Sequence, residues 1–520
     1  MSSAQRVSAS SPEATVPRAE YDALQAQVQS LKVQLDWFKR QLFGEKSEKR
    51  LRLDPARQAD LLAALGESLP ETGKPETAKI AYERRKPKQR GEACVTDKGL
   101  RFDETVPVEI IEVAAPELSG PEADQYIVID EKITRRLAQR PGSYVVLEYR
   151  QPVLKHLPTQ SLKTTSAPSA VFEGSLADVS LLAGMVVDKF AWHLPLYRQH
   201  QRLRAAGITL SRTTLTHYVQ RSIELLRPVY DAQLRHMLQS RVLAMDETPH
   251  KAGRKGKGKL NAVWYWPLYG EDDEVCFTYS ASRGRAHVDA VLKDFEGTLL
   301  TDGYAAYERF AANRPEVTHA QCWAHTRRCF ERAEGSEPAS VSEALAMIGE
   351  LYRHEAELRQ QQLEGQARQD YRTRHSLPIV ECFFGWLHEQ RNRLDLLPSD
   401  PFSKALVYAA EREASLRIFL GDPDVPIDTN HLERALRVIP MGRRNWLFNW
   451  TEVGARQVGV IQSLLVTCRL HGVDPYTYLV DVLQRISLHP ARDIAELTPR
   501  RWKALFAANP LRSDLYGLGK

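Results

Sequence analysis

The stretch Leu243-Ala-Met-Asp-Glu-Thr-Pro-His250 is a short apolar run that ends in two adjacent acids, Asp246 and Glu247. Its length and composition predict a buried β-strand. A carboxylate at the end of a buried strand needs a partner, because an isolated charge is unstable away from water. The partner is a helix cap, a basic residue or a metal ion, and acids in comparable places elsewhere help to decide which.

Asp302 holds such a place. Residues 299–307 read Leu-Leu-Thr-Asp-Gly-Tyr-Ala-Ala-Tyr, again an apolar strand followed at once by an aspartate. If the two strands are neighbours in one sheet, Asp246 and Asp302 face each other, and a cation between them relieves their repulsion. Mg²⁺ suits this role because it prefers hard oxygen ligands. The two stretches together therefore predict a magnesium site.

A third acid, Glu433, lies about one turn into a helix predicted for residues 428–437. Structural explanations compete with the catalytic one: Asp302 could cap the following helix, and Glu433 forms a capping-box pattern with Asn430. The sequence also leaves open Glu247 in place of Asp246 and Asp428 in place of Glu433.

The order and spacing of the three acids predict the fold. Asp302 follows Asp246 by 56 residues, and Glu433 follows Asp302 by 131 residues, which requires a helical insertion. A first aspartate on strand one, a second after strand four and a glutamate on a late helix form the plan of a ribonuclease-H-like α/β core. The predicted strands are 241–245, 262–268, 274–279, 298–301 and 316–321, with helices at 285–295 and 304–312.

Length and composition predict a multidomain α+β protein. The 520 residues favour roughly three to four domains, and 43% hydrophobic with 26% charged residues is an ordinary balance. Six cysteines without a dense framework favour a reducing compartment, and the N-terminus lacks the apolar core of a secretory signal. No window has the roughly 18 apolar residues of a membrane span, so we expect a cytoplasmic, nucleoid-associated protein without a membrane partner.

The chain pattern divides the sequence into segments. Leucine-rich positions from Leu24 to Leu42 recur at heptad spacing, which predicts a coiled coil or a helix packed on its own domain. The predicted segments are a disordered stretch (1–20), a coiled-coil helix (21–50), a linker (51–100), a small β-rich module (101–157), a second linker (158–174), a helical helix-turn-helix region (175–240), the first part of the core (241–321), a helical insertion (322–427), core C-terminal helices with Glu433 (428–490) and a tail (491–520).

Residues 196–219 have the cadence of a helix-turn-helix, with Gly207 at the turn and Ser211 as the cap of the second helix. The exposed start of such a helix reads base edges in the major groove of DNA. An ordinary pair of antiparallel helices is the alternative. The candidate DNA-binding residues at this position are Arg212, Thr213, Thr214 and His217.

These features resemble the DDE transposases of the bacterial insertion-sequence-66 family. The resemblance implies that Asp246, Asp302 and Glu433 are catalytic and hold two Mg²⁺ or Mn²⁺ ions. It also implies cleavage and transfer of DNA strands at insertion-sequence ends. Expected partners are terminal inverted repeats, target DNA, a second or further copy of the chain and accessory proteins of the same element. The stretches that carry the resemblance are 181–199, 243–248, 299–307, 321–328, 430–437, 440–446 and 497–503, with 42–49 at the N-terminal helix.

Phosphate contacts should dominate DNA binding and make it salt dependent. Trp446 and Trp450 either stack on unpaired bases or fill a core. Further candidates are Lys255, Lys257 and Lys259 in a Gly/Lys loop (251–259) beside Asp246, then His325, Arg327 and Arg328 after the second aspartate, and Arg443 and Arg444 after the glutamate helix.

One departure from the family concerns zinc. Members usually carry paired CxxC knuckles after the coiled coil, whereas residues 94–157 contain only Cys94, with His156 at the far end. We therefore expect no zinc there. A second set, His319, Cys322, His325 and Cys329, supplies four possible ligands, but we expect these residues to support a strand-helix junction or to approach DNA.

Three other functions are alternatives. One is a DNA-binding regulator that uses the helix-turn-helix and has an inactive core. Another is a different nuclease of the ribonuclease-H-like fold, such as a junction resolvase. A glycosidase with paired carboxylates is a third alternative, but the helix-turn-helix and basic runs would then have no purpose.

Overall fold

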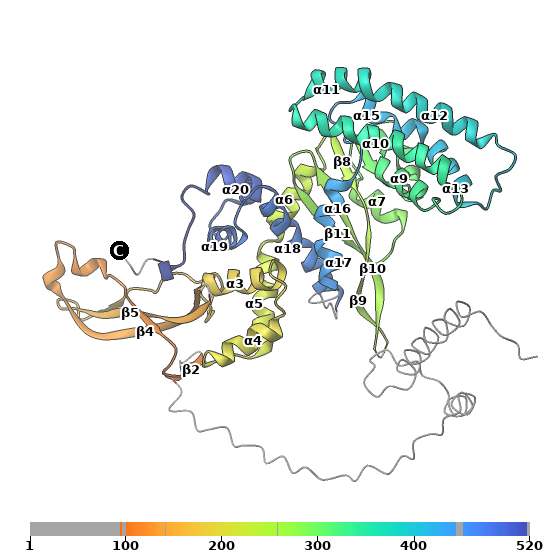
Figure 1. Ribbon diagram of the computed structural model, residues 1–520. Helices are drawn as coiled ribbons and strands as arrows, with labels where there is room; N and C mark the ends of the chain where they lie inside the picture. Colours follow the sequence, from red (N-terminus) through yellow and green to blue (C-terminus); the bar gives the residue numbers. More distant parts are fainter. Residues whose placement is uncertain (1–93, 96–99, 141, 257, 444–450, 517–520) are drawn as a thin grey trace, which may run out of the picture. The chain divides into compact units, whose positions relative to one another are not determined.

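Figure 1 shows the computed structural model, which describes residues 94–95, 100–140, 142–256, 258–443 and 451–516. The chain divides into two units, Met1–Lys86 and Pro87–Lys520, and every described residue belongs to the second. The predicted disordered stretch, coiled coil and nearly all of the first linker lie outside the described residues. The described residues form a mixed α+β structure with mixed sheets and many helices.

The largest sheet has six strands in the order β11-β10-β8-β12-β13, with β9 paired to β10. β8 separates two kinds of pairing, because it runs antiparallel to β10 and parallel to β12. All four residues of β8 are buried, as expected for a strand that is covered on both faces. The strands are β8 (Val242–Met245), β9 (Thr248–Gly256), β10 (Lys259–Gly270), β11 (Val275–Ser280), β12 (Gly297–Thr301) and β13 (Val317–Gln321).

The prediction of a loop at 251–259 is wrong, since residues 251–256 and Lys259 belong to two paired strands. β9 and β10 pair from Thr248 opposite Tyr265 to Gly256 opposite Lys259. The buried residues Thr248, His250 and Ala252 alternate with exposed ones, which is strand periodicity. The glycines and lysines of the distal half hid this alternation, so the sequence predicts five strands where the structure has six.

Helix α18 (Glu452–Leu470) packs closely against β11. A Cβ atom added to Gly459 would lie 2.6 Å from the carbonyl oxygen of Phe277. Ser463 Oγ accepts a hydrogen bond from Phe277 N at 2.8 Å, so the helix is joined to the strand by polar contacts as well. Two shorter helices, α7 (Arg285–Val291) and α8 (Ala305–Ala311), precede and follow β12.

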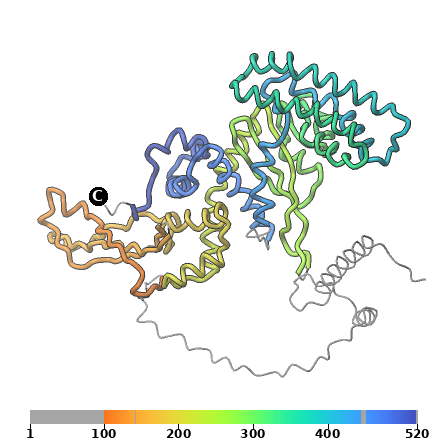
Figure 2. The backbone as a smooth tube through the Cα atoms, viewed as in Figure 1, coloured from red at the N-terminus to blue at the C-terminus, as the bar shows by residue number. Residues whose placement is uncertain are grey.

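A helical layer follows β13 and returns the chain to the core (Figures 1 and 2). Arg372 is buried within it, and its guanidinium donates to both carboxylate oxygens of Glu355 at 2.8 and 2.9 Å. The same guanidinium donates to backbone carbonyls between Phe419 and Val425. The elements are α9 (Trp323–Glu331), α10 (Pro338–Gln360), α11 (Gly365–Tyr371), the π-helix η3 (Arg372–Ser376), α12 (Leu377–Arg391), α13 (Pro401–Ala410), α14 (Glu413–Leu416) and α15 (Ile418–Gly421).

Four helices precede the core: α3 (Val179–Phe190), α4 (Leu196–Ala205), α5 (Arg212–Leu225) and α6 (Arg227–Met237). The turn between α4 and α5 has the predicted chemistry, because Gly207 has a φ of +83° and Ser211 Oγ accepts from Thr214 N at 3.0 Å. The turn also contains β7 (Ile208–Thr209), which pairs with β2 (Arg101–Phe102); β2 in turn pairs with β1 (Cys94–Val95).

A four-stranded sheet lies before these helices, and its last strand falls in the predicted second linker. The core of this sheet contains Leu147, Tyr149 and, from the far end of the chain, Leu515. His156 uses both ring nitrogens in hydrogen bonds, to Thr159 Oγ1 at 2.6 Å and Gln125 Oε1 at 3.1 Å. The elements are β3 (Val108–Glu112), η1 (Pro116–Leu118), η2 (Ala123–Gln125), β4 (Tyr126–Arg140), β5 (Ser143–His156) and β6 (Leu162–Thr164).

The C-terminal stretch that the sequence predicts as a tail is largely folded. Trp502 is buried, and its indole Nε1 donates to the buried carboxylate of Asp481 at 3.1 Å. Among the described helices, none combines the length and apolar content that crossing a membrane requires. The remaining elements are α16 (Asn430–Leu436), α17 (Val438–Arg443), α19 (Pro475–Arg485), η4 (Ala491–Leu497), α20 (Pro499–Leu505) and η5 (Asp514–Tyr516).

Candidate active site

Asp246 and Asp302 follow the ends of two adjacent strands. β8 and β12 are parallel, with Val242 opposite Thr298 and Ala244 opposite Leu300. Continuing this register by two residues places Asp246 beside Asp302, and neighbouring strands lie about 4.8 Å apart. The sequence expectation that the two aspartates face each other therefore agrees with the strand pairing.

The environment of Asp246 disfavours its charged form. Burial and the negative charge of the neighbouring Asp302 raise the pKa of Asp246 to about 7, although a hydrogen bond from Glu247 N at 2.7 Å opposes the shift. A cation bound between the two carboxylates would remove this penalty. Two aspartates in this arrangement are the donor set that a divalent metal prefers.

The turn after Asp302 is held from two sides. Asp302 Oδ1 accepts a hydrogen bond from Tyr304 N at 2.9 Å, and α8, which begins at Ala305, has no side-chain cap. A Cβ added to Gly303 would lie 2.5 Å from Tyr408 Oη, and Arg412 Nη2 donates to Gly303 O at 3.4 Å. The helical insertion thus contacts the backbone of this turn directly.

Glu433, on α16, reaches the same place from the far end of the insertion. Its negative charge is the smallest of the causes that raise the pKa of Asp246. The capping-box alternative is not formed: the Asn430 side chain donates to Asp428 instead of interacting with Glu433. Strand register thus pairs the two aspartates, and Glu433 acts on Asp246 through its charge.

The carboxylate of Glu433 is paired with an arginine. Arg328 Nη2 lies 2.7 Å from each of its oxygens, and His325 Nε2 lies 3.7 Å from Oε1. As the side chains stand, no group of three or more His, Cys, Asp or Glu among the described residues could hold a metal ion. The two aspartates fit a metal, whereas Glu433 would join them only after releasing Arg328.

Glu247 is buried on a separate network that sequence reasoning missed. Tyr307 Oη donates to Oε2 at 2.7 Å, and Arg283 donates to Oε1 at 2.6 and 2.9 Å. With its carboxylate engaged in this way, Glu247 anchors the segment that follows β8. No motif around Arg283 or Tyr307 marks these residues in the sequence, because the contacts join positions 36 and 60 residues away.

Two of the four possible zinc ligands, His319 in β13 and Cys322 directly after it, have hydrogen-bond partners of their own. His319 Nε2 meets Thr301 Oγ1 at 2.9 Å, next to Asp302. Cys322 Sγ accepts hydrogen bonds from the backbone and hydroxyl of Thr429, four residues before Glu433. These contacts connect the strand-helix junction to the segments that carry the second and third acids. They agree with the expectation that these residues support this junction.

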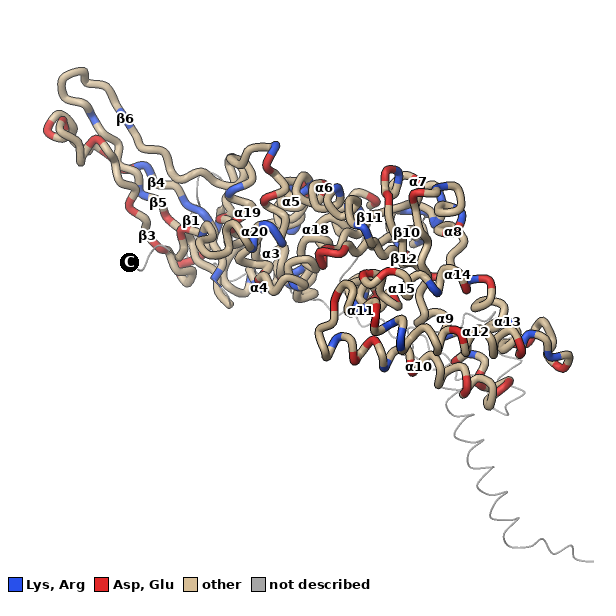
Figure 3. The backbone as a smooth tube through the Cα atoms, turned by 90° about the horizontal axis from the view of Figure 1, so that it is seen from above, with Lys and Arg blue, Asp and Glu red and all other residues tan. Residues whose placement is uncertain are grey.

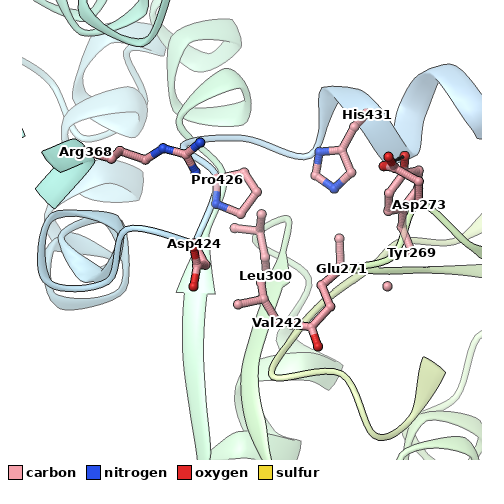
Figure 4. Close-up of a pocket in the computed structure, with 11 residues that line it drawn as sticks. Val242, Tyr269, Glu271, Asp273, Leu300, Arg368, Asp424, Pro426 and His431 are labelled. Atoms are coloured by element: carbon pink, nitrogen blue, oxygen red, sulfur yellow. Dashed lines mark hydrogen bonds between the residues drawn. The ribbon is translucent and has the colours of Figure 1, made fainter. Parts of the chain in front are cut away.

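A cavity of about 340 Å³ lies against β8, β12 and the end of β10. Ala244 and Leu300, each two residues before one of the paired aspartates, line this cavity, whereas none of the three acids is among its lining residues. Figure 4 shows His431 of α16 on one side of this cavity and Asp424 on the other.

The candidate DNA-binding residues on α5 lie at its start. Arg212, Thr213 and His217 are exposed, and the Arg212 guanidinium lies 5.8 Å from the centre of the Tyr197 ring. Thr214 is half-buried, and its hydroxyl pairs with Ser211 Oγ at 2.9 Å. Three of the four side chains are thus available to a partner.

The remaining candidates are scattered. Lys255 and Lys259 are exposed near the tip of the β9–β10 hairpin, roughly 25 Å along an extended strand from Asp246 rather than beside it. Arg327 pairs with Glu331 at 2.9 Å. Arg443 is exposed and donates to Pro249 O. Lys257, Arg444, Trp446 and Trp450 lie outside the described residues.

Comparisons with known proteins agree with this geometry. Residues 174–457 match the family described as "Transposase IS66 family", and residues 463–500 match the "IS66 C-terminal element". Residues 30–159 match the description "Transposase C of IS166 homeodomain". The first of these matches covers the helices before the core, the sheet, the insertion and Glu433.

Relatives from Sinorhizobium fredii (strain NBRC 101917 / NGR234) cover most of the chain. The uncharacterized protein y4jD is 32% identical over 65% of this chain and 68% of its own length. The uncharacterized protein y4hP is 30% identical over 73% of this chain and 72% of its own length. With a family match across more than half of its residues, the chain belongs to the IS66 family of transposases.

Proposed function

We propose that this protein cleaves DNA strands at insertion-sequence ends and transfers them to target DNA in a metal-dependent reaction. Membership of a DDE transposase family implies phosphoryl transfer on DNA and a divalent metal. The convergence of Asp246, Asp302 and Glu433 carries the proposal. Three acids from distant parts of the chain that meet at a strand end are the expected donor set for such chemistry.

The sheet topology supports a ribonuclease-H-like core. Three antiparallel strands, β8, β10 and β11, lead into two parallel strands, β12 and β13, with β8 in the middle. The first aspartate follows the first strand of this sheet, and the glutamate follows a helical insertion. β9 is an additional strand that pairs with β10, and it does not alter the pairing of β8 with β12 that aligns the two aspartates.

We assign Asp246 and Asp302 as ligands of two Mg²⁺ or Mn²⁺ ions, with Glu433 as the third acid. Bound metal would activate a water nucleophile and stabilise the leaving 3′ oxygen. Glu247, held by Tyr307 and Arg283, fixes the backbone next to Asp246. Arg328 binds the Glu433 carboxylate. When this contact opens, the Arg328 guanidinium becomes free to bind a DNA phosphate.

DNA recognition is assigned to α5 and to basic residues around the core. Arg212, Thr213 and His217 are exposed at the start of α5, the position from which a recognition helix reads the major groove. The β9–β10 hairpin carries Lys255 and Lys259 to its tip, and a two-stranded ribbon also fits a major groove. These lysines would contact DNA away from the cleavage point.

A dimer or higher oligomer, together with accessory proteins of the same element, completes the proposal. The later heptad positions, from Leu31 to Leu42, lie in the region matched by the N-terminal family description. Parallel pairing of such helices is the expected route to an oligomer. Light scattering of the full chain, compared with a chain lacking residues 1–86, checks this part of the proposal.

The decisive experiment mixes the purified full chain with a labelled insertion-sequence end, target DNA and Mg²⁺. We expect strand cleavage and a joined donor-target product, both abolished by EDTA. Asp302→Asn keeps the shape of the side chain and removes its charge, so it should lower cleavage at least about 1,000-fold while DNA binding persists. Asp294→Asn, an exposed acid between α7 and β12, is the matched control.

The outcomes separate this function from the alternatives. Cleavage without any joined product would indicate another nuclease of the same fold. Binding without cleavage at any divalent metal would indicate a DNA-binding protein with an inactive core. Equal activity of Asp302→Asn and Asp294→Asn would refute the assignment of the site.

A further inference from the structure

A second cavity, of about 440 Å³, lies beside the helix that carries Glu433 and has no role in the reaction described above. It is formed by the segments that follow α3, by the end of β10 and by α16, α17 and α18. We call it the arginine pocket. Its lining residues are His193, Tyr269, His431, Arg434, Ala435, Arg437, Val438, Met441, Val466, Arg469 and Leu470.

The arginine pocket lies on the opposite side of α16 from the catalytic carboxylate. His431, Arg434 and Ala435 follow the three- and four-residue spacing of one helix face. Glu433 is two residues from His431, about 200° around the helix. The pocket is therefore a separate site that shares a helix with the catalytic centre.

The charge of the pocket is strongly one-sided. Arg434, Arg437 and Arg469 are exposed, and no acid is among the lining residues. Within the described part of the chain, none of the three forms an ion pair with an Asp or Glu. Three like charges around one cavity repel each other, and a bound anion would relieve this repulsion.

The contrast with the neighbouring cavity is direct. His431 and Tyr269 line both cavities and contact each other edge to face at 4.6 Å between ring centres. Glu271, Asp273 and Asp424 line the first cavity together with a single arginine, Arg368 (Figure 4). An anion is therefore favoured on the arginine side alone.

The floor of the arginine pocket is apolar. Val438 and Val466 lie on α17 and α18, and Met441 and Leu470 are 60% and 41% exposed. Apolar side chains beside a cationic rim do not suit a small hydrated anion, which offers nothing to cover them. They suit a ligand with a flat, weakly polar body attached to a phosphate.

We propose that the arginine pocket binds an unstacked nucleotide of the DNA substrate, with its phosphate on the arginines and its base on the apolar floor. This inference rests on the proposed function in that DNA is the substrate. In a duplex the bases are held inside the stack, so only a nucleotide that has left the stack reaches the floor. Trp192, next to His193, is 73% exposed and offers a further stacking surface.

The test measures binding of the Asp302→Asn full chain to an unpaired oligothymidine and to a duplex of equal length, across a salt series. Arg434→Gln/Arg437→Gln should weaken oligothymidine binding at least about tenfold and reduce the salt slope by about 1.4. Met441→Asn should weaken it about threefold or more without changing the slope. Duplex binding through α5 should change less than threefold for both variants.

The matched control is Arg359→Gln/Arg391→Gln, which removes two exposed arginines of the helical insertion. Unchanged oligothymidine binding by both pocket variants would overturn the inference. Equal losses for oligothymidine and duplex would overturn it too, because they would show a general backbone contact. Cleavage by the unaltered protein is assayed in parallel. Unchanged oligothymidine binding by the pocket variants would overturn the inference about the pocket without affecting the proposed reaction. Absence of cleavage would refute the reaction without changing the binding result.

Discussion

At the residue scale, the active site depends on two aspartates that strand pairing forces together. Asp246 and Asp302 are 56 residues apart in the chain but occupy matched positions on adjacent parallel strands. Their mutual repulsion, added to burial, raises the pKa of Asp246 to about 7. The metal-free protein thus stores an unfavourable interaction at the place where a cation is expected.

This interaction predicts a pH-dependent stability. The pKa of Asp246 is about 7 in the folded state and near 3.8 in the unfolded state. The free energy of unfolding should therefore fall as pH rises from about 4 to about 7, and it should stay at the lower value above pH 7. Asp246→Asn removes the penalty, so it should stabilise the protein by about 1–3 kcal/mol at pH 8 and hardly at pH 4. Chemical denaturation with EDTA present measures this, with Asp294→Asn as control. A benefit equal at both pH values would contradict the explanation.

The pair of Arg328 and Glu433 makes a second prediction at this scale. The guanidinium competes with metal for the carboxylate, since it lies 2.7 Å from both oxygens. Arg328→Gln should therefore tighten Mn²⁺ binding several-fold, although it removes a cation–carboxylate contact. Titration calorimetry of the DNA-free protein measures the affinity. Weaker Mn²⁺ binding would show instead that Arg328 orients Glu433 for the metal.

Arg327→Gln is the neighbouring control for this measurement. Arg327 pairs with Glu331, at 2.9 Å, rather than with a catalytic acid. Its replacement removes the same charge from the same helix, α9. Mn²⁺ affinity should stay within about twofold of the unaltered protein, because an exposed pair of this kind contributes little.

At the element scale, α18 is placed against the sheet by the absence of a side chain. Gly459 lets the helix approach β11 until backbone oxygen Phe277 O lies within 2.6 Å of where a Cβ would be. Ser463 and Thr467 then hydrogen-bond the strand at Phe277 and Val275. The buried middle of this helix would otherwise leave the polar backbone edge of the strand unsatisfied.

Gly459→Ala should therefore destabilise the protein, by about 1–3 kcal/mol, because the methyl group meets a backbone atom that cannot move alone. Gly349→Ala is the matched control, a mid-helix glycine of α10 with open space around its Cβ position. That change should stabilise the protein by about 0.5–1 kcal/mol through helix propensity. Thermal unfolding of both variants gives the comparison. Stabilisation by both would mean that α18 is not closely seated on the strand.

At the whole-molecule scale, the helical insertion must return the chain so that Glu433 meets the aspartates. Arg372 holds the return segment by donating to carbonyls from Phe419 to Val425 while pairing with Glu355. Arg241, next to β8, pairs with Asp422 and Asp424 on the same segment. Figure 3 shows acidic and basic residues interspersed along the insertion helices, in keeping with such pairing.

Arg372→Met should destabilise the protein by about 3–5 kcal/mol, because it leaves Glu355 buried and unpaired. Arg372→Met/Glu355→Met should recover part of this loss, since the remaining charge is also removed. Cleavage should be lower in both variants than in the unaltered protein, because the carbonyls of the return segment lose their hydrogen-bond donor. Denaturant unfolding and the cleavage assay report the two effects. Full cleavage activity in the double variant would show that the contacts of Arg372 with the return segment are not needed to position Glu433.

The sequence alone was sufficient to identify the family and the chemistry of the turn before α5, and it singled out three acids whose roles stay a prediction. These signals are local: a strand that ends in an acid, a glycine at positive φ and a serine cap each occupy a few consecutive residues. The hairpin β9–β10 escaped prediction because its glycines and lysines have low strand propensity, and pairing with β10 overrides that preference.

Only the tertiary structure decided which side chains meet. The contact of Arg328 with Glu433 joins residues 105 positions apart, and the network of Glu247 joins three segments. The arginine pocket takes residues from segments as far apart in the chain as His193 and Leu470. Such contacts depend on packing distances of a few ångströms between elements, and the alternation and spacing of residues along the chain carry no information about them.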